Sequence, residues 1–243
     1  MLKKILLYTV ATVATCYIIF TMFFLPKSKE VELCNGINIT IVGENKDVLP
    51  AEYVKKAIIK ANMNPTGKPL DKVDCGKIEK FFNKMSIVDE CQSYKTHKGV
   101  VGIKIHCKEP IMQVFDKNGK IFYIDRDGAI IENIHNAMYL PVASGNIDRK
   151  MATKELLTIA LFLQENRFWN EQTEQVYFDE KREVVLVPRI GNHTVELGKP
   201  DKLKEKLDKL EKFYKKGLSI AGWNKYSKIN IEIDKQVICT KRK

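Results

Sequence analysis

The sequence predicts an α+β protein with a single N-terminal transmembrane helix, a small β-α-α-β-β domain, and a mixed α+β domain rich in antiparallel sheet. Three patterns indicate this architecture. The chain begins with an uncharged apolar segment, continues with helical and alternating apolar spacing between residues 34 and 109, and ends with many short alternating runs separated by turn residues.

The apolar segment Ile5–Leu25 contains no charged residue. At 1.5 Å per residue, a helix of this length spans about 30 Å, which is the thickness of a bilayer core. The segment is longer than the apolar core of a signal peptide, and its end at Met22–Pro26 lacks a small-residue cleavage site. We therefore expect an uncleaved transmembrane helix at residues 5–25, preceded by a short cytoplasmic tail at residues 1–4.

The orientation of this helix depends on the charges that flank it. Lys3 and Lys4 precede the segment and Lys27 and Lys29 follow it, so the positive-inside rule is nearly balanced. Because the tail is short and almost all of the chain lies on the other side, we expect the tail to stay inside. The large region, which follows a linker at residues 26–33, is then exported.

The region 34–109 is predicted to form the small domain, because apolar residues in it recur first at a spacing of two, then at helical spacing, then at a spacing of two again. Pro110 interrupts the last strand pattern and marks the boundary. The predicted elements are a strand at Ile37–Ile41, helices after Pro50 and after the N-cap Asp74, and a hairpin that joins Ser86–Tyr94 to Gly99–Cys107.

The region 110–243 is predicted to form the larger domain. Asn118-Gly119 is a strong hairpin signal, and Asp125–Gly128 reads as the next turn. The other predicted elements are a helix at Asp148–Phe168, strands at Gln175–Phe178, Glu183–Arg189 and His193–Leu197, a helix that buries Leu203, Leu207, Leu210 and Tyr214, and terminal strands at Ile229–Ile233 and Val237–Thr240.

No motif in the chain indicates an enzyme, a metal site or a cofactor. The nucleophile elbow, the P-loop, the dinucleotide fingerprint and the H-E-x-x-H zinc motif are all missing. Cys91, His97, His106 and Cys107 lie close together in sequence, but the neighbours His106 and Cys107 point to opposite faces of a strand, which argues against zinc. Asp125–Gly128 lacks the further ligands of a calcium loop.

Two histidines and the cysteines have interpretations that involve no catalytic or binding role. His135 and His193 have no carboxylate or nucleophile at a motif spacing, so we expect surface or loop positions. Of the 6 cysteines, Cys16 lies in the apolar segment, which leaves an odd number outside it. Pairing the hairpin about its centre places Cys91 near Cys107, so either a cross-strand disulfide or two free thiols would fit.

The end of the chain is a candidate for partner binding. Ile229, Ile231 and Ile233 alternate with polar residues, which by itself indicates only a half-buried strand. A last strand at a sheet edge would also expose backbone groups that another chain could extend. The net charge of +11 is spread over many lysines, which favours solubility over a dedicated anionic partner.

The whole layout resembles the bacterial cell-division family FtsQ/DivIB, in its Bacteroidetes-type form, with a POTRA-like first domain. The resemblance covers nearly all of residues 5–240 and rests on order together with short phrases. These phrases are Lys108-Glu109-Pro110-Ile111, Phe122-Tyr123-Ile124-Asp125 with Gly128, Leu140-Pro141-Val142 with Gly145, Val195-Glu196-Leu197-Gly198, and Trp223-Asn224-Lys225-Tyr226-Ser227-Lys228-Ile229-Asn230-Ile231.

The resemblance implies a non-enzymatic bitopic scaffold of the divisome that links septal peptidoglycan synthesis to division. It implies location in the inner membrane at the division site, with the C-terminal region periplasmic, an FtsQ-type β domain at residues 110–243, and no cofactor. The implied partners are FtsB-like and FtsL-like bitopic proteins, the septal peptidoglycan synthase complex and, through residues 5–25, the lipid bilayer, with no nucleic acid.

In this family the partner adds a strand to the last strand of the β domain. The positions that correspond are Tyr226, Ser227, Lys228, Ile229, Asn230, Ile231, Glu232, Ile233, Gln236, Val237 and Ile238. The ending Gln236–Thr240 departs from the proteobacterial pattern, so the resemblance supports a backbone role and not particular side-chain contacts.

Two functions from other classes compete with this interpretation. An exported, membrane-anchored POTRA-type chaperone or substrate-handling module would bind unfolded strands with little selectivity. A membrane-anchored wall hydrolase is disfavoured because no paired catalytic residues are found.

Overall fold

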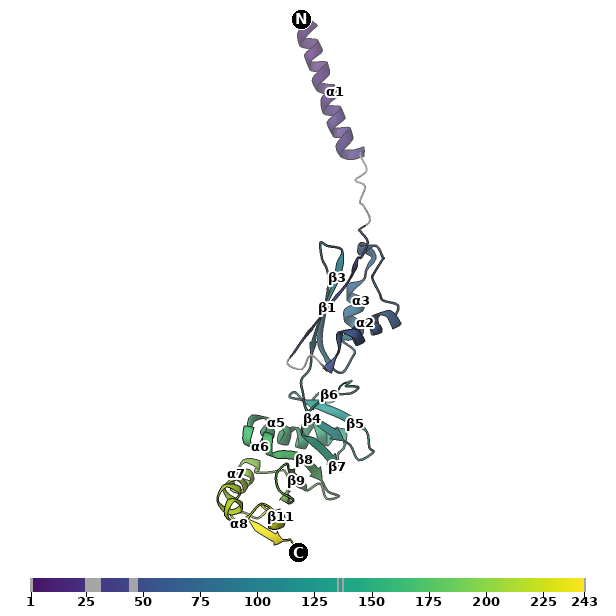
Figure 1. The fold of residues 1–243 in the computed structure, drawn as a ribbon. Coiled ribbons are helices and arrows are strands. Elements are labelled where there is room, and N and C mark those ends of the chain that lie inside the picture. Colours follow the sequence, from purple (N-terminus) through teal and green to yellow (C-terminus); the bar gives the residue numbers. More distant parts are fainter. Residues whose placement is uncertain (1, 25–31, 44–47, 135, 137, 243) are drawn as a thin grey trace.

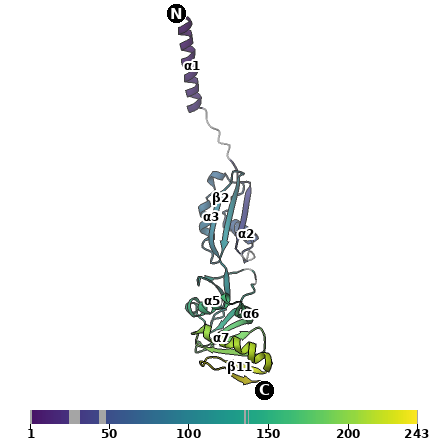
Figure 2. The ribbon, with the colours of Figure 1, turned by 90° about the vertical axis from the view of Figure 1, so that its left-hand side faces the viewer.

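The computed structural model describes residues 2–24, 32–43, 48–134, 136 and 138–242. They form the helix α1 (Leu2–Phe24) and two folded units that follow one another along an elongated molecule (Figures 1 and 2). The first unit lies between α1 and the second unit, and the C-terminus lies at the far end of the second unit.

The predicted transmembrane helix is not confirmed. Within the described residues, no helix is both long enough and apolar enough to cross a membrane. The side chains of α1 are described only from Tyr8 to Thr21, so part of the predicted span Ile5–Leu25 and most of the predicted linker 26–33 lie outside the described residues.

The first unit has the predicted β-α-α-β-β order. Its three-stranded sheet has the order β1-β3-β2, with β1 parallel to β3 and β2 antiparallel to β3. Its elements are β1 (Gly36–Val42), α2 (Ala51–Lys60), the short 3₁₀ turn η2 (Leu70–Lys72), α3 (Cys75–Phe82), β2 (Val88–Lys95) and β3 (Val100–Cys107).

The sequence signals that predicted these helices act as expected. Pro50 is the N-cap residue of α2, and the Asp74 side chain accepts a hydrogen bond from the Lys77 backbone N–H at 3.0 Å at the start of α3. Val54 on α2 and Phe82 on α3 are fully buried in the core that these helices share with the sheet. Burial of one apolar stripe per helix holds both helices on one face of the sheet.

The second unit is built on a nine-stranded sheet with the order β12-β11-β10-β9-β8-β7-β4-β5-β6. Its elements are β4 (Pro110–Phe115), β5 (Ile121–Asp125), β6 (Ile130–Ile131), β7 (Val142–Gly145), α4 (Arg149–Met151), the π-helical η3 (Ala152–Leu156), α5 (Leu157–Glu165), α6 (Arg167–Gln172), β8 (Thr173–Phe178), β9 (Val184–Pro188), β10 (Thr194–Gly198), α7 (Leu203–Phe213), the π-helical η4 (Tyr214–Leu218), α8 (Ser219–Ala221), β11 (Tyr226–Asn230) and β12 (Ile238–Lys241).

The helix predicted at Asp148–Phe168 is shorter than expected. Asp148 caps its start by accepting the Met151 N–H at 2.8 Å, but the helix ends at Glu165. The Asn166 side chain accepts the Trp169 N–H at 3.3 Å and begins a separate helix, α6. This break turns Trp169 into the core, where it is 2% exposed.

The turns of the second unit are held by aspartates. Asp116 Oδ1 accepts the N–H groups of Asn118 and Lys120, each at 2.8 Å, in the predicted Asn-Gly hairpin. Asp125 Oδ1 accepts the N–H groups of Asp127 at 3.0 Å and Ala129 at 2.7 Å. Asp125 is therefore a turn residue, as its sequence context predicted.

The two units are joined by direct contacts around β6. The Ser86 hydroxyl donates to the Glu132 carbonyl at 3.0 Å and accepts the Glu132 N–H at 2.9 Å. Ile131 is fully buried and belongs to the apolar core of the first unit, although its strand belongs to the sheet of the second. The β6 edge of the large sheet is thus covered by the first unit.

Candidate partner-binding edge

The C-terminal strand β12 is the outermost strand of the large sheet. It pairs antiparallel with β11, and within the described residues no strand lies on its other side. Because the opposite edge at β6 contacts the first unit, β12 is the open edge of this sheet. Figure 1 places it at the end of the molecule farthest from α1.

The alternation of the backbone determines which groups of β12 face the open side. The Arg242 N–H donates to the Lys225 carbonyl at 3.0 Å, so Arg242 faces β11. By the two-residue repeat of an antiparallel ladder, Ile238 and Thr240 face β11 as well. Cys239 and Lys241 therefore direct their N–H and C=O groups outward, where an added strand could bond them.

Most of the residues predicted to bind a partner do not lie on this edge. The backbone of β11 is enclosed by ladders to β10 on one side and β12 on the other. The predicted strand Ile229–Ile233 ends at Asn230, and the Ile231 N–H donates to the Glu196 carbonyl at 3.0 Å. On β11 lie Tyr226, Ser227, Lys228, Ile229 and Asn230; in the connection lie Ile231, Glu232, Ile233, Gln236 and Val237; β12 begins at Ile238.

The residues that form the edge, Cys239 and Lys241, were not among the predicted binding residues. A strand was predicted at Val237–Thr240, which includes Cys239 but stops before Lys241. The spatial order of the strands was not predicted, because β10 and β11 are parallel neighbours joined through α7, and local spacing carries no information about that crossover.

The strand β11, which lies next to the edge strand β12, is held by its buried isoleucines and by a lysine that contacts the connection after it. Ile229 and Ile231 are fully buried in the core of the second unit. The Lys209 ammonium donates to the carbonyls of Ile231 at 2.8 Å and Ile233 at 2.6 Å. Burial lowers the pKa of Lys209, with the charge of Asp234 acting in the opposite direction. Lys209 therefore anchors the connection between β11 and β12 to α7.

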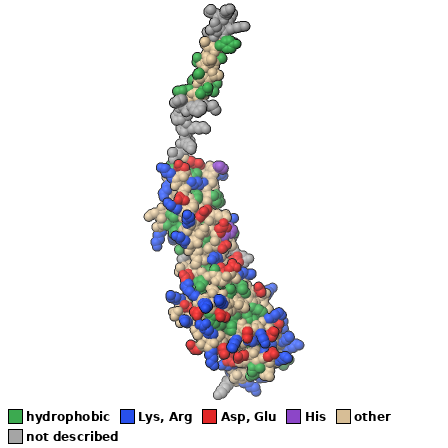
Figure 3. Space-filling view, turned by 180° about the vertical axis from the view of Figure 1, so that it is seen from behind, with side chains coloured by type: hydrophobic (Ala, Val, Ile, Leu, Met, Phe, Trp, Pro, Cys, Tyr) green, Lys and Arg blue, Asp and Glu red, His purple; other side chains and the backbone are tan. Residues whose placement is uncertain are grey.

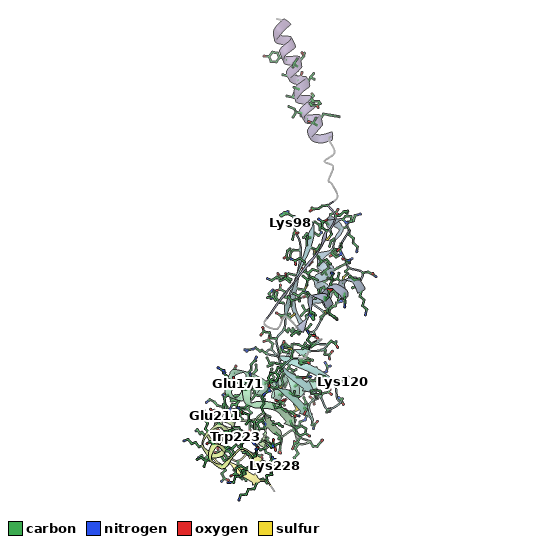
Figure 4. The ribbon with its side chains drawn as sticks, viewed as in Figure 1. Lys98, Lys120, Glu171, Glu211, Trp223 and Lys228 are labelled. Atoms are coloured by element: carbon green, nitrogen blue, oxygen red, sulfur yellow. The ribbon has the colours of Figure 1, made fainter. Side chains whose placement is uncertain are left out.

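His193 lies in the loop directly before β10, which fits one of the two expected positions, but it is buried and not at the surface. It is 3% exposed, and its Nε2 lies 2.8 Å from the Tyr214 hydroxyl. The ring meets the Tyr214 ring edge-on, and Tyr214 in turn packs against Trp223, which is labelled in Figure 4. Burial lowers the pKa of His193, and burial raises the pKa of Tyr214.

The surface around the edge carries both signs of charge. Lys228 donates to Glu196 Oε1 at 2.8 Å on the open face of the sheet. A hollow of about 650 Å³ between α7 and the β11–β12 connection is lined by lysines and carboxylates in similar numbers. Figure 3 likewise shows Lys and Arg mixed with Asp and Glu over the second unit. This mixture favours the solubility interpretation of the net charge.

The Cys91–Cys107 disulfide is not formed. The register places Cys91 opposite Ile105 and Cys107 opposite Val88, because a bulge lies between Val88 and Glu90. Residues offset by two positions across a ladder are about 7–8 Å apart, which is too far for a disulfide. Both thiols are free, and burial raises the pKa of each to about 11.

The sequence argues against a zinc site at Cys91, His97, His106 and Cys107, and the geometry of the described residues offers none. Among the residues that the structure describes, no three or more histidine, cysteine, aspartate or glutamate side chains come together as a metal site. His97 lies at the tip of the β2–β3 hairpin, whereas Cys91 lies in the core of the first unit. His135 lies outside the described residues.

Two family models match the chain, one for each folded unit. Residues 109–240 match the model described as FtsQ/DivIB, C-terminal related, and residues 32–106 match the model of a POTRA-like domain. Among the curated proteins, none matches the chain.

Proposed function

The chain belongs to the FtsQ/DivIB C-terminal related family, and from this membership we propose that it is a non-enzymatic, membrane-anchored scaffold of bacterial cell division. The family and the POTRA-like first unit support a role in division through protein contacts. The particular partner and the membrane anchor are further parts of the proposal.

The proposed binding mode is strand addition at β12. An FtsB-like partner, in complex with an FtsL-like protein, adds a strand whose N–H and C=O groups bond the outward groups of Cys239 and Lys241. The observation that carries this proposal is the position of β12 as the open edge of a nine-stranded sheet whose other edge is covered. β11 then supports the edge and does not receive the partner.

The proposed anchor is the apolar segment at residues 5–25, which holds the protein in the inner membrane with the folded units in the periplasm. The helix α1 and the uncharged sequence of this segment support that part of the proposal. A tether of this kind confines the β12 edge near partners in the same membrane, which raises their effective concentration. Binding would then link the septal peptidoglycan synthase complex to the division site.

The test is a pull-down from membranes of the source cells with the full chain carrying Cys239→Pro. Proline removes an outward N–H and leaves the bonds to β11 in place, so we expect recovery of the partner complex to fall at least tenfold. Cys239→Ala is the matched control, because it removes the same thiol and keeps the N–H. Equal recovery with proline and alanine would rule out strand addition at this edge.

Depletion of the protein distinguishes scaffolding from the chaperone alternative. A divisome scaffold predicts filaments without septa by microscopy, with rescue by Cys239→Ala but not by Cys239→Pro. Normal septation after depletion would contradict a role in division. Binding of many unrelated unfolded strands, without one preferred complex, would instead favour the chaperone.

A further inference from the structure

The two edge strands of the sheet in the first unit, β2 and β1, differ in how their outward backbone groups are bonded. At the β2 edge, Asn83 Oδ1 accepts the Cys91 N–H at 2.8 Å, and Glu79 Oε1 accepts the Ser93 N–H at 2.7 Å. Glu79 lies on α3 and Asn83 is the C-cap residue of that helix, and both N–H groups would otherwise face an incoming strand. These two side chains thus occupy the positions that the carbonyls of an added strand would take.

Within the part of the chain that the structure describes, the β1 edge has no comparable closure. β1 is the outermost strand on the other side of this sheet, and it pairs with β3 without a register shift over its whole length. Its sequence, Gly-Ile-Asn-Ile-Thr-Ile-Val, holds no charged residue and no proline. Lysine, proline and bulges are the usual features that prevent pairing at an edge, and β1 has none of them.

The faces of β1 indicate what kind of segment would fit. Ile37, Ile39 and Ile41 pack against the core but stay half-exposed, whereas Asn38 and Thr40 are exposed on the other face. An added strand with apolar residues at alternate positions would continue the isoleucine row and cover its outer side. A charged residue placed there would lose water without gaining an ion pair, so an uncharged segment fits best.

We propose that β1 is a second strand-addition site, which takes an extended, uncharged segment of another protein with apolar residues at alternate positions. This site is separate from β12 and lies on the unit nearer to α1.

A second copy of the chain fits this edge less well. Two copies that continue one sheet with their helices on the same face pair their β1 strands antiparallel. β1 begins at the end of the unit nearer to α1 and runs away from it (Figure 1). Antiparallel pairing would therefore place the two α1 helices at opposite ends, which two chains anchored in one membrane cannot adopt. This step alone rests on the proposed anchor.

The probe for the site is a free peptide with the sequence of residues 36–42 and a soluble tag beyond a Gly-Ser spacer. Being untethered, it can pair antiparallel with β1 and place isoleucine beside isoleucine. We expect the full chain in detergent micelles to bind it with one-to-one stoichiometry by fluorescence anisotropy. Hydrogen exchange of the β1 amides should slow, while that of the β2 amides should not change.

Three variants decide the proposal. Thr40→Lys puts a charge on the open edge and should weaken binding at least tenfold, whereas Gln92→Lys, an exposed position on the closed β2 edge, should have no effect. Asn38→Lys repeats the test at a second exposed position if Thr40→Lys lowers the unfolding temperature. Glu79→Ala with Asn83→Ala should open β2 and raise the stoichiometry to two.

The results of this peptide-binding test can be distinguished from those of the pull-down test of β12. Peptide binding that survives both lysine variants in β1, or protection on β2 instead of β1 in the unmodified chain, would overturn the proposal. Dimerisation of the chain that Thr40→Lys abolishes would overturn the choice of occupant. Cys239→Pro should leave peptide binding unchanged, so failure of the β12 proposal and failure of this one give different results.

Discussion

His193 shows how one buried residue can make the second unit sensitive to pH. Its imidazole lies between the Tyr214 hydroxyl and the backbone around Trp223, and the Arg242 guanidinium lies near enough to repel a second positive charge. Burial first, and then this repulsion, lower its pKa from the ordinary value, while an interaction with the Trp223 backbone opposes the shift. Folding therefore favours the neutral ring.

The predicted consequence is a loss of stability in mild acid. The unfolded chain takes up a proton near the ordinary histidine pKa of about 6.5, whereas the folded chain does so only at lower pH. The free energy of unfolding should fall as pH drops below about 6.5, by at most about 1.4 kcal/mol per pH unit from this group.

Denaturant unfolding followed by tryptophan fluorescence at pH 7 and pH 5.5 measures this loss. His193→Gln keeps a polar partner for Tyr214 but cannot titrate, so it should flatten the dependence. An unchanged pH dependence in that variant would show that other groups cause it. His97, which is on the hairpin tip of the first unit, offers the matched control substitution His97→Gln.

At the scale of elements, Lys209 is expected to control how firmly β12 is held. Lys209→Met keeps the length of the side chain but removes two hydrogen bonds from an ammonium to the carbonyls of Ile231 and Ile233. Charged hydrogen bonds contribute roughly 1.5–3 kcal/mol each, and partial exposure reduces that value, so we expect a loss of about 1–3 kcal/mol.

Hydrogen exchange locates the effect of Lys209→Met. The amides of β11 and β12 should exchange faster, and those of β4 and β5 should not change. Lys212→Met, one turn further along α7 and lining the same hollow, is the control. Equal effects of the two substitutions would mean that charge near the hollow matters, and not the link to the connection.

The elements themselves were largely predictable, because their signals are local. Asp74 caps its helix as predicted, the helix predicted from Asp148 begins there, and the Asn118-Gly119 hairpin forms with Asp116 holding the turn. The break at Asn166 was missed because the apolar spacing continues through it. The Asn166 side-chain cap and the burial of Trp169 in the folded core together favour a new helix start over continuation.

The site was less predictable than the fold, for a physical reason. Spacing along the chain determines which face of a strand is buried, but neighbours in a sheet are chosen by packing between distant segments. The predicted binding residues on β11 are central because α7 carries the chain across to a parallel neighbour. The burial of His193 was missed likewise, since its partners Tyr214 and Trp223 come from later elements.

At the scale of the whole molecule, each sheet has one edge that is covered and one that is open. The side chains of Glu79 on α3 and of its C-cap residue Asn83 close β2, and the first unit covers β6. β1 and β12 stay open within the described residues, one on each unit. The two strand additions proposed above would lie at different distances from α1, and a fixed relation between the two units would keep those distances constant.

The contact at β6 is expected to supply that fixed relation. Neighbouring isoleucines of this strand pack in different cores: Ile131 is fully buried in the first unit, whereas Ile130 packs against the core of the second. Ile131→Ala should therefore lower the stability of the first unit by about 2–4 kcal/mol, the usual cost of a cavity left by a buried isoleucine, although the substitution lies in the other sheet.

Hydrogen exchange in the two units separates this effect from a local one. With Ile131→Ala, the amides of β3 at Val101, Ile103 and Ile105 should lose protection, and small-angle scattering should show a broader distribution of distances between the units. Ile130→Ala, the adjacent control, should weaken the second unit and leave β3 protected. If Ile131→Ala leaves β3 unchanged, the units are independent, and strands bound at β1 and β12 would not be held in a fixed relation.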